Sequence, residues 1–155
     1  MRINQSILDR LIDDDPGLLS DSPGSPLKSL YQLKQAVRRD MEWILNTRRV
    51  PDDIPEKYPE TIDSLATYGL PDFTALGSRS ATAQEQIRRA IEEAIRRFEP
   101  RLTEVSVAVG SIEGGKQVLS FRIEAQLRVD PAPELVVFDT TVDLFSGECA
   151  VKGSE

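Results

Sequence analysis

The side chains in this sequence that suit general acid–base chemistry are carboxylates, because none of its 155 residues is histidine. Histidine is the usual general base near neutral pH and the commonest metal ligand, so its absence excludes Ser–His–Asp and Cys–His triads. Hydrolysis would need two carboxylates facing each other across a cleft, as in glycosidases. Glu99, Asp139 and Asp143 are the candidates. The alternative is that all three belong to the solvated surface, where most acidic side chains lie.

The tripeptide Glu99-Pro100-Arg101 places two opposite charges on either side of a rigid proline. Because proline restricts the backbone of the residue before it, the chain direction is fixed here, and we expect both side chains to be well displayed. In one interpretation they contact a partner protein, a role that suits the planar guanidinium of arginine. In the other, they pair with nearby groups and pin this junction of the chain.

Three further features carry charge or possible chemistry. Arg48 and Arg49 follow a predicted helix, where they either cap its last carbonyl groups or contact a partner. Cys149 is the only cysteine, so the chain has no internal disulfide and lacks the ligands of a usual zinc site, which suits a reducing compartment. The glycines between 110 and 115 do not join a strand to a helix and indicate a hairpin turn, not a phosphate cradle. We therefore expect no cofactor and no metal.

Composition and charge exclude several functional classes. Lysine and arginine total 19 against 26 acidic residues, which gives a net charge of −7. Nucleic-acid binding depends on basic side chains that neutralise phosphates, so we do not expect it. No apolar run approaches the ~20 residues of a membrane span. The first residues include acidic side chains where a secretion signal needs an apolar core, so we expect a cytoplasmic protein.

Helical periodicity marks the first two thirds of the chain. Apolar residues recur every three or four positions over 27–46 and over 82–98, which predicts two long amphipathic helices. Thr82 and Glu85 have the spacing of a capping box at the start of the second. A shorter helix is predicted over 61–68, followed by Gly69 in a left-handed cap position.

Another short amphipathic helix is predicted near the N-terminus, with a single apolar stripe. The segment 15–26 after it holds three prolines and two glycines and is predicted to be a linker. We therefore divide the chain into residues 1–26, the helix and linker, and 27–155, the main domain. Either this domain or a partner protein covers the stripe, which consists of Ile7, Leu8, Leu11 and Ile12.

After Pro100 the apolar period changes from 3.6 to 2. The alternation predicts strands over 105–109, 119–128 and 136–144, and a short edge strand over 149–151. Turn residues separate these strands, which indicates an antiparallel meander packed on the long helices. Helices first and strands last define the α+β class, with at least one sheet edge available to another chain.

Four motifs follow each other in the order LNTRR (45–49), YGLPD (68–72), FEPRL (98–102) and FDT (138–140). In these motifs the chain resembles TssE, the type VI secretion baseplate subunit related to the wedge proteins of contractile phage tails. The similarity runs through almost the whole chain. It implies a structural adaptor that is not an enzyme and that lies in the cytoplasm, within a baseplate docked at the inner membrane.

The resemblance also implies partners and a site. The wedge subunits TssF and TssG and the sheath subunits TssB and TssC are the implied partners, with no direct membrane insertion. Glu99, Pro100 and Arg101 match the motif that contacts the sheath in this family. A free sheet edge would then template sheath polymerisation by β-strand pairing, in which backbone hydrogen bonds supply affinity.

Two alternatives remain open at this point. The family carries a lysozyme-like label, which suggests a peptidoglycan hydrolase, although a cytoplasmic chain does not meet peptidoglycan. The same fold family includes a regulatory anti-adaptor, which would make this chain a binding module. The intact Glu-Pro-Arg sequence favours the baseplate branch over the anti-adaptor.

Overall fold

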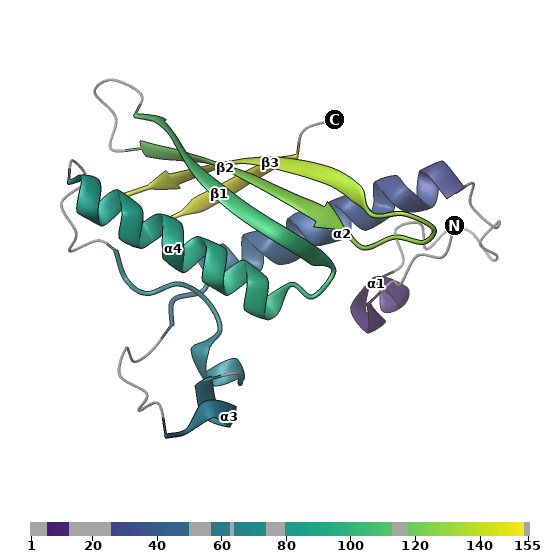
Figure 1. Ribbon diagram of the computed structural model, residues 1–155, viewed down its shortest axis with the longest axis horizontal. Coiled ribbons are helices and arrows are strands. Elements are labelled where there is room, and N and C mark those ends of the chain that lie inside the picture. The colour runs from purple at the N-terminus through teal and green to yellow at the C-terminus, as the bar shows by residue number, and fades with distance from the viewer. Residues whose placement is uncertain are drawn as a thin grey trace.

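The computed structural model describes residues 6–12, 26–49, 57–62, 64–73, 80–112 and 118–153. Two long helices, α2 (Pro26–Asn46) and α4 (Ala81–Phe98), pack on one face of a four-stranded antiparallel sheet (Figure 1). The strands lie in chain order across the sheet, and the predicted α+β meander is confirmed. They are β1 (Leu102–Ile112), β2 (Val118–Leu127), β3 (Glu134–Asp143) and β4 (Cys149–Gly153).

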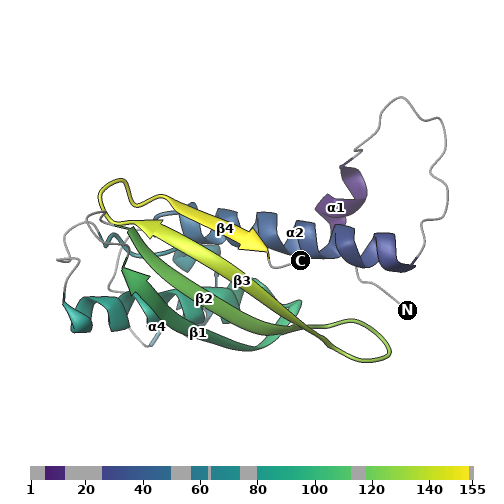
Figure 2. The ribbon, with the colours of Figure 1, turned by 90° about the horizontal axis from the view of Figure 1, so that it is seen from above.

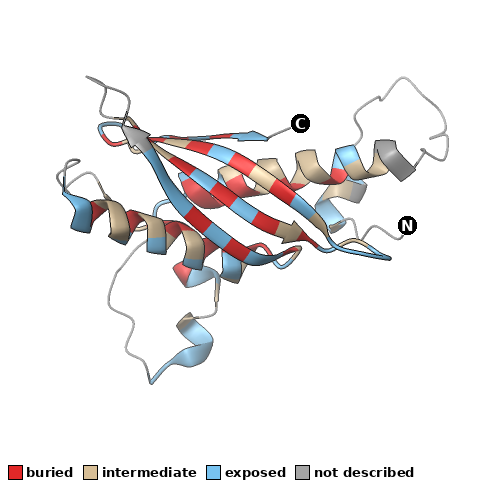
Figure 3. Cartoon of the chain, turned by 45° about the horizontal axis from the view of Figure 1, so that its top comes forward, coloured by how far each residue is buried: buried red, intermediate tan, exposed pale blue. Residues whose placement is uncertain are grey.

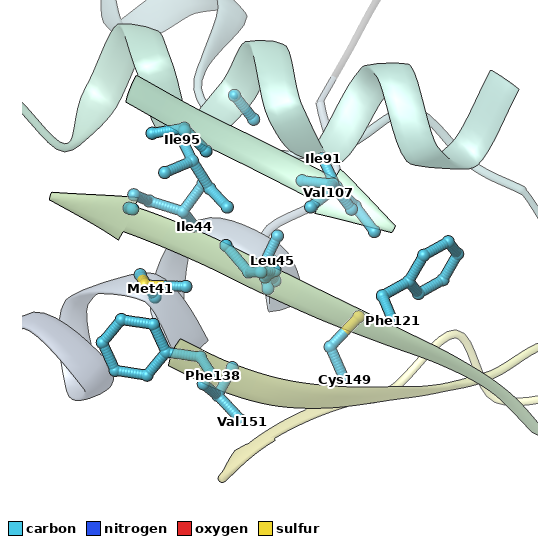
Figure 4. Packing of buried hydrophobic residues seen from close by; sticks show 14 of the residues in the cluster. Met41, Ile44, Leu45, Ile91, Ile95, Val107, Phe121, Phe138, Cys149 and Val151 are labelled. Atoms are coloured by element: carbon cyan, nitrogen blue, oxygen red, sulfur yellow. The ribbon is translucent and has the colours of Figure 1, made fainter. Parts of the chain in front are cut away.

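Each long helix buries the stripe that its periodicity predicts, and the two stripes meet the inner face of the sheet. In Figure 4, Met41, Ile44 and Leu45 of α2 and Ile91 and Ile95 of α4 lie in one cluster with Phe121 and Phe138 of the middle strands. Burial of such large apolar side chains is the main favourable term in folding. The buried helix residues are Leu33, Val37, Met41, Ile44 and Leu45 of α2 and Ala83, Ile87, Ile91, Ala94 and Ile95 of α4.

The predicted capping box at the start of α4 is wrong. The N-cap residue is Ser80, and its side chain makes no capping hydrogen bond. Glu85 instead forms ion pairs with Arg88 (2.8 Å) and Arg89 (2.7 Å), one turn further along the same helix. The arginines one turn away compete successfully for the carboxylate because charge-assisted bonds are the stronger ones.

The two faces of the sheet differ in polarity, as the alternation predicts. Side chains on one face are buried under the helices, whereas those on the other are mostly exposed or half-buried (Figure 3). Arg122 and Asp139 lie opposite each other on the open face and form an ion pair of 3.0 Å. One wet face and one covered face make this a two-layer domain.

Several short elements complete the described chain: α1 (Ile7–Leu11), α3 (Pro59–Ile62) and a 3₁₀ turn (Leu65–Thr67). The last two replace the single helix predicted over 61–68. Gly69 has φ +98°, the left-handed conformation that was predicted, and a Cβ there would collide with the carbonyl oxygen of Thr47. None of the helices within the described ranges is long and apolar enough to cross a membrane.

Parts of two predictions lie outside the described residues. They are residues 15–25 of the predicted linker and residues 113–115 of the turn predicted over 110–115. The start of that turn was predicted wrongly, because β1 continues to Ile112.

Candidate partner-binding site

Three of the four sequence motifs meet in space around Leu70. Its N–H donates to the carbonyl oxygen of Thr47 (2.8 Å), and its own carbonyl accepts from the N–H of Arg49 (2.8 Å). These bonds join the end of the LNTRR motif to the YGLPD motif. The Tyr68 ring then meets the Phe98 ring edge to face, with centroids 5.1 Å apart. The motif residues therefore connect the end of α2, the segment after the 3₁₀ turn and the end of α4.

The interpretation of Arg48 as a cap of α2 is wrong. The last carbonyl groups of the helix are bound by its own neighbours, since Asn46 Nδ2 donates to the Glu42 carbonyl (2.8 Å) and Thr47 Oγ1 to that of Trp43 (2.7 Å). Arg48 instead donates to the Ser146 carbonyl (3.0 Å) and lies 3.5 Å from Asp72. Its side chain is half exposed and joins two loops.

The Glu-Pro-Arg motif lies where α4 ends and β1 begins. Because Pro100 disfavours helical geometry at Glu99, the helix stops there and the Glu99 carboxylate turns inward. Glu99 is 2% exposed and accepts hydrogen bonds from Arg101 Nε (2.7 Å) and from the Arg101 N–H (3.1 Å). The expectation that both charged side chains are well displayed is therefore wrong. Pro100 is the exposed member of the motif.

Arg101 links this junction to two other elements. Its Nη2 lies 2.5 Å from Asp40 of α2, and its Nη1 lies 3.2 Å from Asp9 of α1. Arg39 repeats the arrangement, because its Nη2 contacts both Asp9 (2.7 Å) and Asp40 (2.8 Å). We refer to Asp9, Arg39, Asp40, Glu99 and Arg101 as the charged cluster.

The surroundings of Asp9 favour its charged form. Burial raises the pKa of this carboxyl, but hydrogen bonds from Arg39 and Ser6 and the positive charge of Arg101 outweigh burial and lower it. Partly buried carboxylates keep their charge when arginines and N–H groups bind them in this way. Asp9 is therefore ionised at neutral pH.

The neighbouring carboxylates in turn keep Arg101 in its charged form. Burial lowers its pKa, but the hydrogen bonds and negative charges of Glu99 and Asp40 raise it well above the usual value. The cluster also affects Tyr68. Its pKa is raised mainly by burial and to a smaller extent by the negative charges of Asp40 and Glu99. The charged cluster and the YGLPD motif thus form one neighbourhood.

The carboxylates proposed for hydrolysis are engaged in three different environments. Glu99 is buried within the charged cluster, and Asp139 pairs with Arg122 on the open face of the sheet. Asp143 accepts N–H bonds from Phe145 (2.8 Å) and Ser146 (3.1 Å) in the turn after β3. Over the ranges that the structure describes, no group of three or more His, Cys, Asp or Glu residues is arranged to hold a metal ion.

The edge strand β4 is covered by side chains of α2. Asn46 accepts from the Cys149 N–H (2.8 Å) and donates to the Cys149 carbonyl (2.9 Å), while Glu42 accepts from the Val151 N–H (3.3 Å). A step of four residues along a helix is about 6 Å and two residues along a strand about 6.6 Å, so the spacings match. Sequence reasoning missed this contact, whose only local signal is the polar pair at helical spacing.

The opposite edge, β1, is covered less completely. Arg96 of α4 donates to the Val105 carbonyl (2.8 Å), and Arg88 lies 3.5 Å from the Val107 carbonyl. These two bonds engage carbonyl groups of an eleven-residue strand, whereas α2 binds both N–H and carbonyl groups of the five-residue β4. The longer edge is therefore the more available one.

These features define a two-layer α+β domain with a partly buried charged cluster and two partly capped sheet edges. The model of the baseplate wedge protein gp25 family matches residues 31–132, about two thirds of the sequence. The chain belongs to the baseplate wedge protein gp25 family, which confirms the resemblance that the four motifs indicate.

A solved structure supports the fold. A chain of the structure described as "The baseplate complex from the type VI secretion system" aligns with a TM-score of 0.51 at 20% identity. The alignment covers 72% of the present chain and 95% of the other. Among curated proteins, no sequence matches significantly. At this identity the likeness establishes a shared fold.

Proposed function

We propose that this protein is a structural subunit of a type VI secretion baseplate, which joins the wedge to the sheath. The observation that carries the proposal is the family match over residues 31–132, and the fold shared with a chain of a type VI baseplate complex supports it. The partners we propose are TssF and TssG in the wedge and TssB and TssC in the sheath. The assembly would lie in the cytoplasm against the inner membrane.

We further infer that the role is not enzymatic. Each carboxylate that the hydrolase alternative requires already binds an arginine or backbone N–H groups, as described above. A general acid needs a free path to substrate, which such partners obstruct. Reproducible release of muropeptides from peptidoglycan by the purified protein, lost in Glu99→Gln, would restore the hydrolase alternative.

We place the sheath contact at Glu99, Pro100 and Arg101 together with the edge of β1, which starts directly after them. Pro100 is the residue of the motif that a partner reaches directly, while Glu99 and Arg101 fix its position through their ion pair. An incoming sheath strand would take over the carbonyl groups that Arg96 and Arg88 now occupy. Each edge contact is thus exchanged for a backbone hydrogen bond.

On the wedge side, we propose that the apolar stripe of α1 binds a groove in a wedge subunit. The stripe consists of Ile7, Leu8, Leu11 and Ile12, of which Ile7 and Leu11 are 77% and 75% exposed. Arg48 and Arg49 are a second proposed contact, near the loop that holds Asp72. The division into residues 1–26 and 27–155 then separates a wedge-binding part from the main domain.

A proline scan of the two edges tests the strand-pairing proposal. Proline lacks the N–H that would donate a hydrogen bond to a carbonyl group of an added strand. It is nevertheless tolerated at an edge position whose N–H faces outward. Val109 has the same parity as Val105 and Val107, so Val109→Pro should abolish sheath assembly in cells while wedge binding remains. Gly153→Pro, at the outward edge of β4, is the matched control and should leave assembly intact. The opposite pattern would move the contact to β4.

A further inference from the structure

The short helix α1 lies against the domain with its polar side inward. Asp9 is the residue that reaches the domain, and its side chain is 8% exposed. Leu11, on the apolar stripe, is 75% exposed, and none of the stripe residues belongs to the core cluster or packs against it. An amphipathic helix that merely covered its own domain would turn the apolar stripe inward. The orientation is therefore the reverse of what a structural cap would show.

Asp9 performs two tasks in α1. Its carboxylate accepts from the Ser6 N–H (3.1 Å), and its own N–H donates to Ser6 Oγ (3.1 Å), which together make a capping box. The same carboxylate binds Arg39 and Arg101. A helix of five residues is far too short to be stable alone. Its structure therefore depends on the residues that fix it to the domain. Figure 2 shows α1 beside α2.

We propose that Asp9, Arg39 and Arg101 form a latch that positions α1 with its apolar stripe outward. The Glu-Pro-Arg motif then acts on baseplate assembly through α1 as well as through the sheath edge. Glu99 and Asp40 belong to the same device, because they orient the Arg101 guanidinium toward Asp9. This makes Asp9 a positioning residue for the wedge contact, an inference that rests on the proposed function.

The geometry of the charges explains why the latch requires a carboxylate at position 9. Each oxygen of Asp9 faces a different arginine, Oδ1 toward Arg39 and Oδ2 toward Arg101. Asparagine in its place would keep the shape and could still accept from Ser6, but it would carry no charge and would present an N–H₂ group to one arginine. Ser6→Ala is the complementary change, because it removes the capping bond and leaves both ion pairs.

Hydrogen–deuterium exchange of the full chain tests the latch without any partner. In Asp9→Asn and in Arg101→Gln, amides over residues 6–12 should exchange roughly ten-fold faster or more, because exchange follows the free energy of local opening. Asp9→Glu should retain most of the protection, and Ser6→Ala should lose less than Asp9→Asn. Arg122→Gln, which breaks an exposed ion pair on the far face, is the control and should change nothing there. Equal exchange in wild type and Asp9→Asn would overturn the latch.

Co-purification with wedge subunits then separates the latch from the proposed function. If α1 carries the wedge contact, folded Asp9→Asn should recover several-fold less TssF and TssG than wild type, as Arg101→Gln should. Full recovery by Asp9→Asn in spite of faster exchange would refute the inference that the motif acts through α1. If wild type itself recovers neither subunit, the proposed function fails, and the exchange data alone still decide whether the latch exists.

Discussion

Replacing Arg101 by glutamine should be among the most destabilising polar substitutions in this chain. The guanidinium is 15% exposed and contacts three carboxylates, of which Glu99 is the most deeply buried. In Arg101→Gln, Glu99 would lose its Nε and Nη2 bonds and keep the backbone N–H bond. Asp9 and Asp40 would keep Arg39.

The loss in the free energy of unfolding follows from the partners that these carboxylates keep. Breaking a buried pair by removing one member costs about 3–5 kcal/mol, and the bonds that survive place Arg101→Gln near the lower end, at about 3 kcal/mol. Arg122→Gln removes an exposed pair, with side chains 59% and 55% accessible, and should cost much less, because water screens such pairs. Urea unfolding followed by circular dichroism and by the fluorescence of Trp43 measures both free energies of unfolding.

A double variant sharpens this test. Glu99→Gln with Arg101→Gln removes both charges together, so it should be more stable than the sum of the two single losses predicts. If Arg101→Gln unfolds with the same free energy as Arg122→Gln, the pair of Glu99 with Arg101 is not shielded from water in solution. Strict additivity in the double variant would likewise contradict a direct Glu99–Arg101 pair.

Four other predictions test separate parts of the fold. Gly69→Ala should lower the free energy of unfolding by about 2–4 kcal/mol in a urea titration, because alanine is strained at φ +98° and its Cβ meets the Thr47 carbonyl. Asn46→Ala should cost about 1–3 kcal/mol by the same measurement, since it leaves the Cys149 N–H and carbonyl without their partner. Burial raises the pKa of the Cys149 thiol to about 11, so a disulfide reagent at pH 8 should label the native protein far more slowly than the unfolded one. The pKa of Asp9 is lower in the folded protein than in the unfolded chain, so its contribution is complete above the unfolded value and is lost as pH falls through the folded one. Amide exchange over residues 6–12, corrected for its intrinsic pH dependence, should therefore lose protection on acidification below about pH 4 before the sheet does. A sheet that loses protection first would contradict that order.

Periodicity predicted the long helices and the strands because it records local burial. The stripe of α4, for example, is set by residues three and four positions apart, and those positions share one face whatever the rest of the chain does. The left-handed conformation at Gly69 was predictable for the same reason, since a helix stop and a following proline lie within a few residues.

The inward orientation of Glu99 was not predictable in this way. Its burial depends on Arg101 being fixed by Asp40 and Asp9, which lie 61 and 92 positions from that arginine along the chain. The sequence shows five separate charges, and only the fold brings them into one cluster. The capping of β4 by Asn46 is similar, because Asn46 and Cys149 are 103 positions apart along the chain. Long-range polar contacts leave little trace in local patterns.

The central claim is that this chain is a structural baseplate subunit, and co-purification from cells tests it most directly. A tagged wild-type chain would be isolated from cells that produce the wedge and sheath subunits, with circular dichroism to confirm folding. We predict recovery of TssF and TssG together with TssB and TssC, and loss of the sheath subunits alone in the folded Val109→Pro variant. Recovery of none of the four by the folded wild-type protein would contradict the claim.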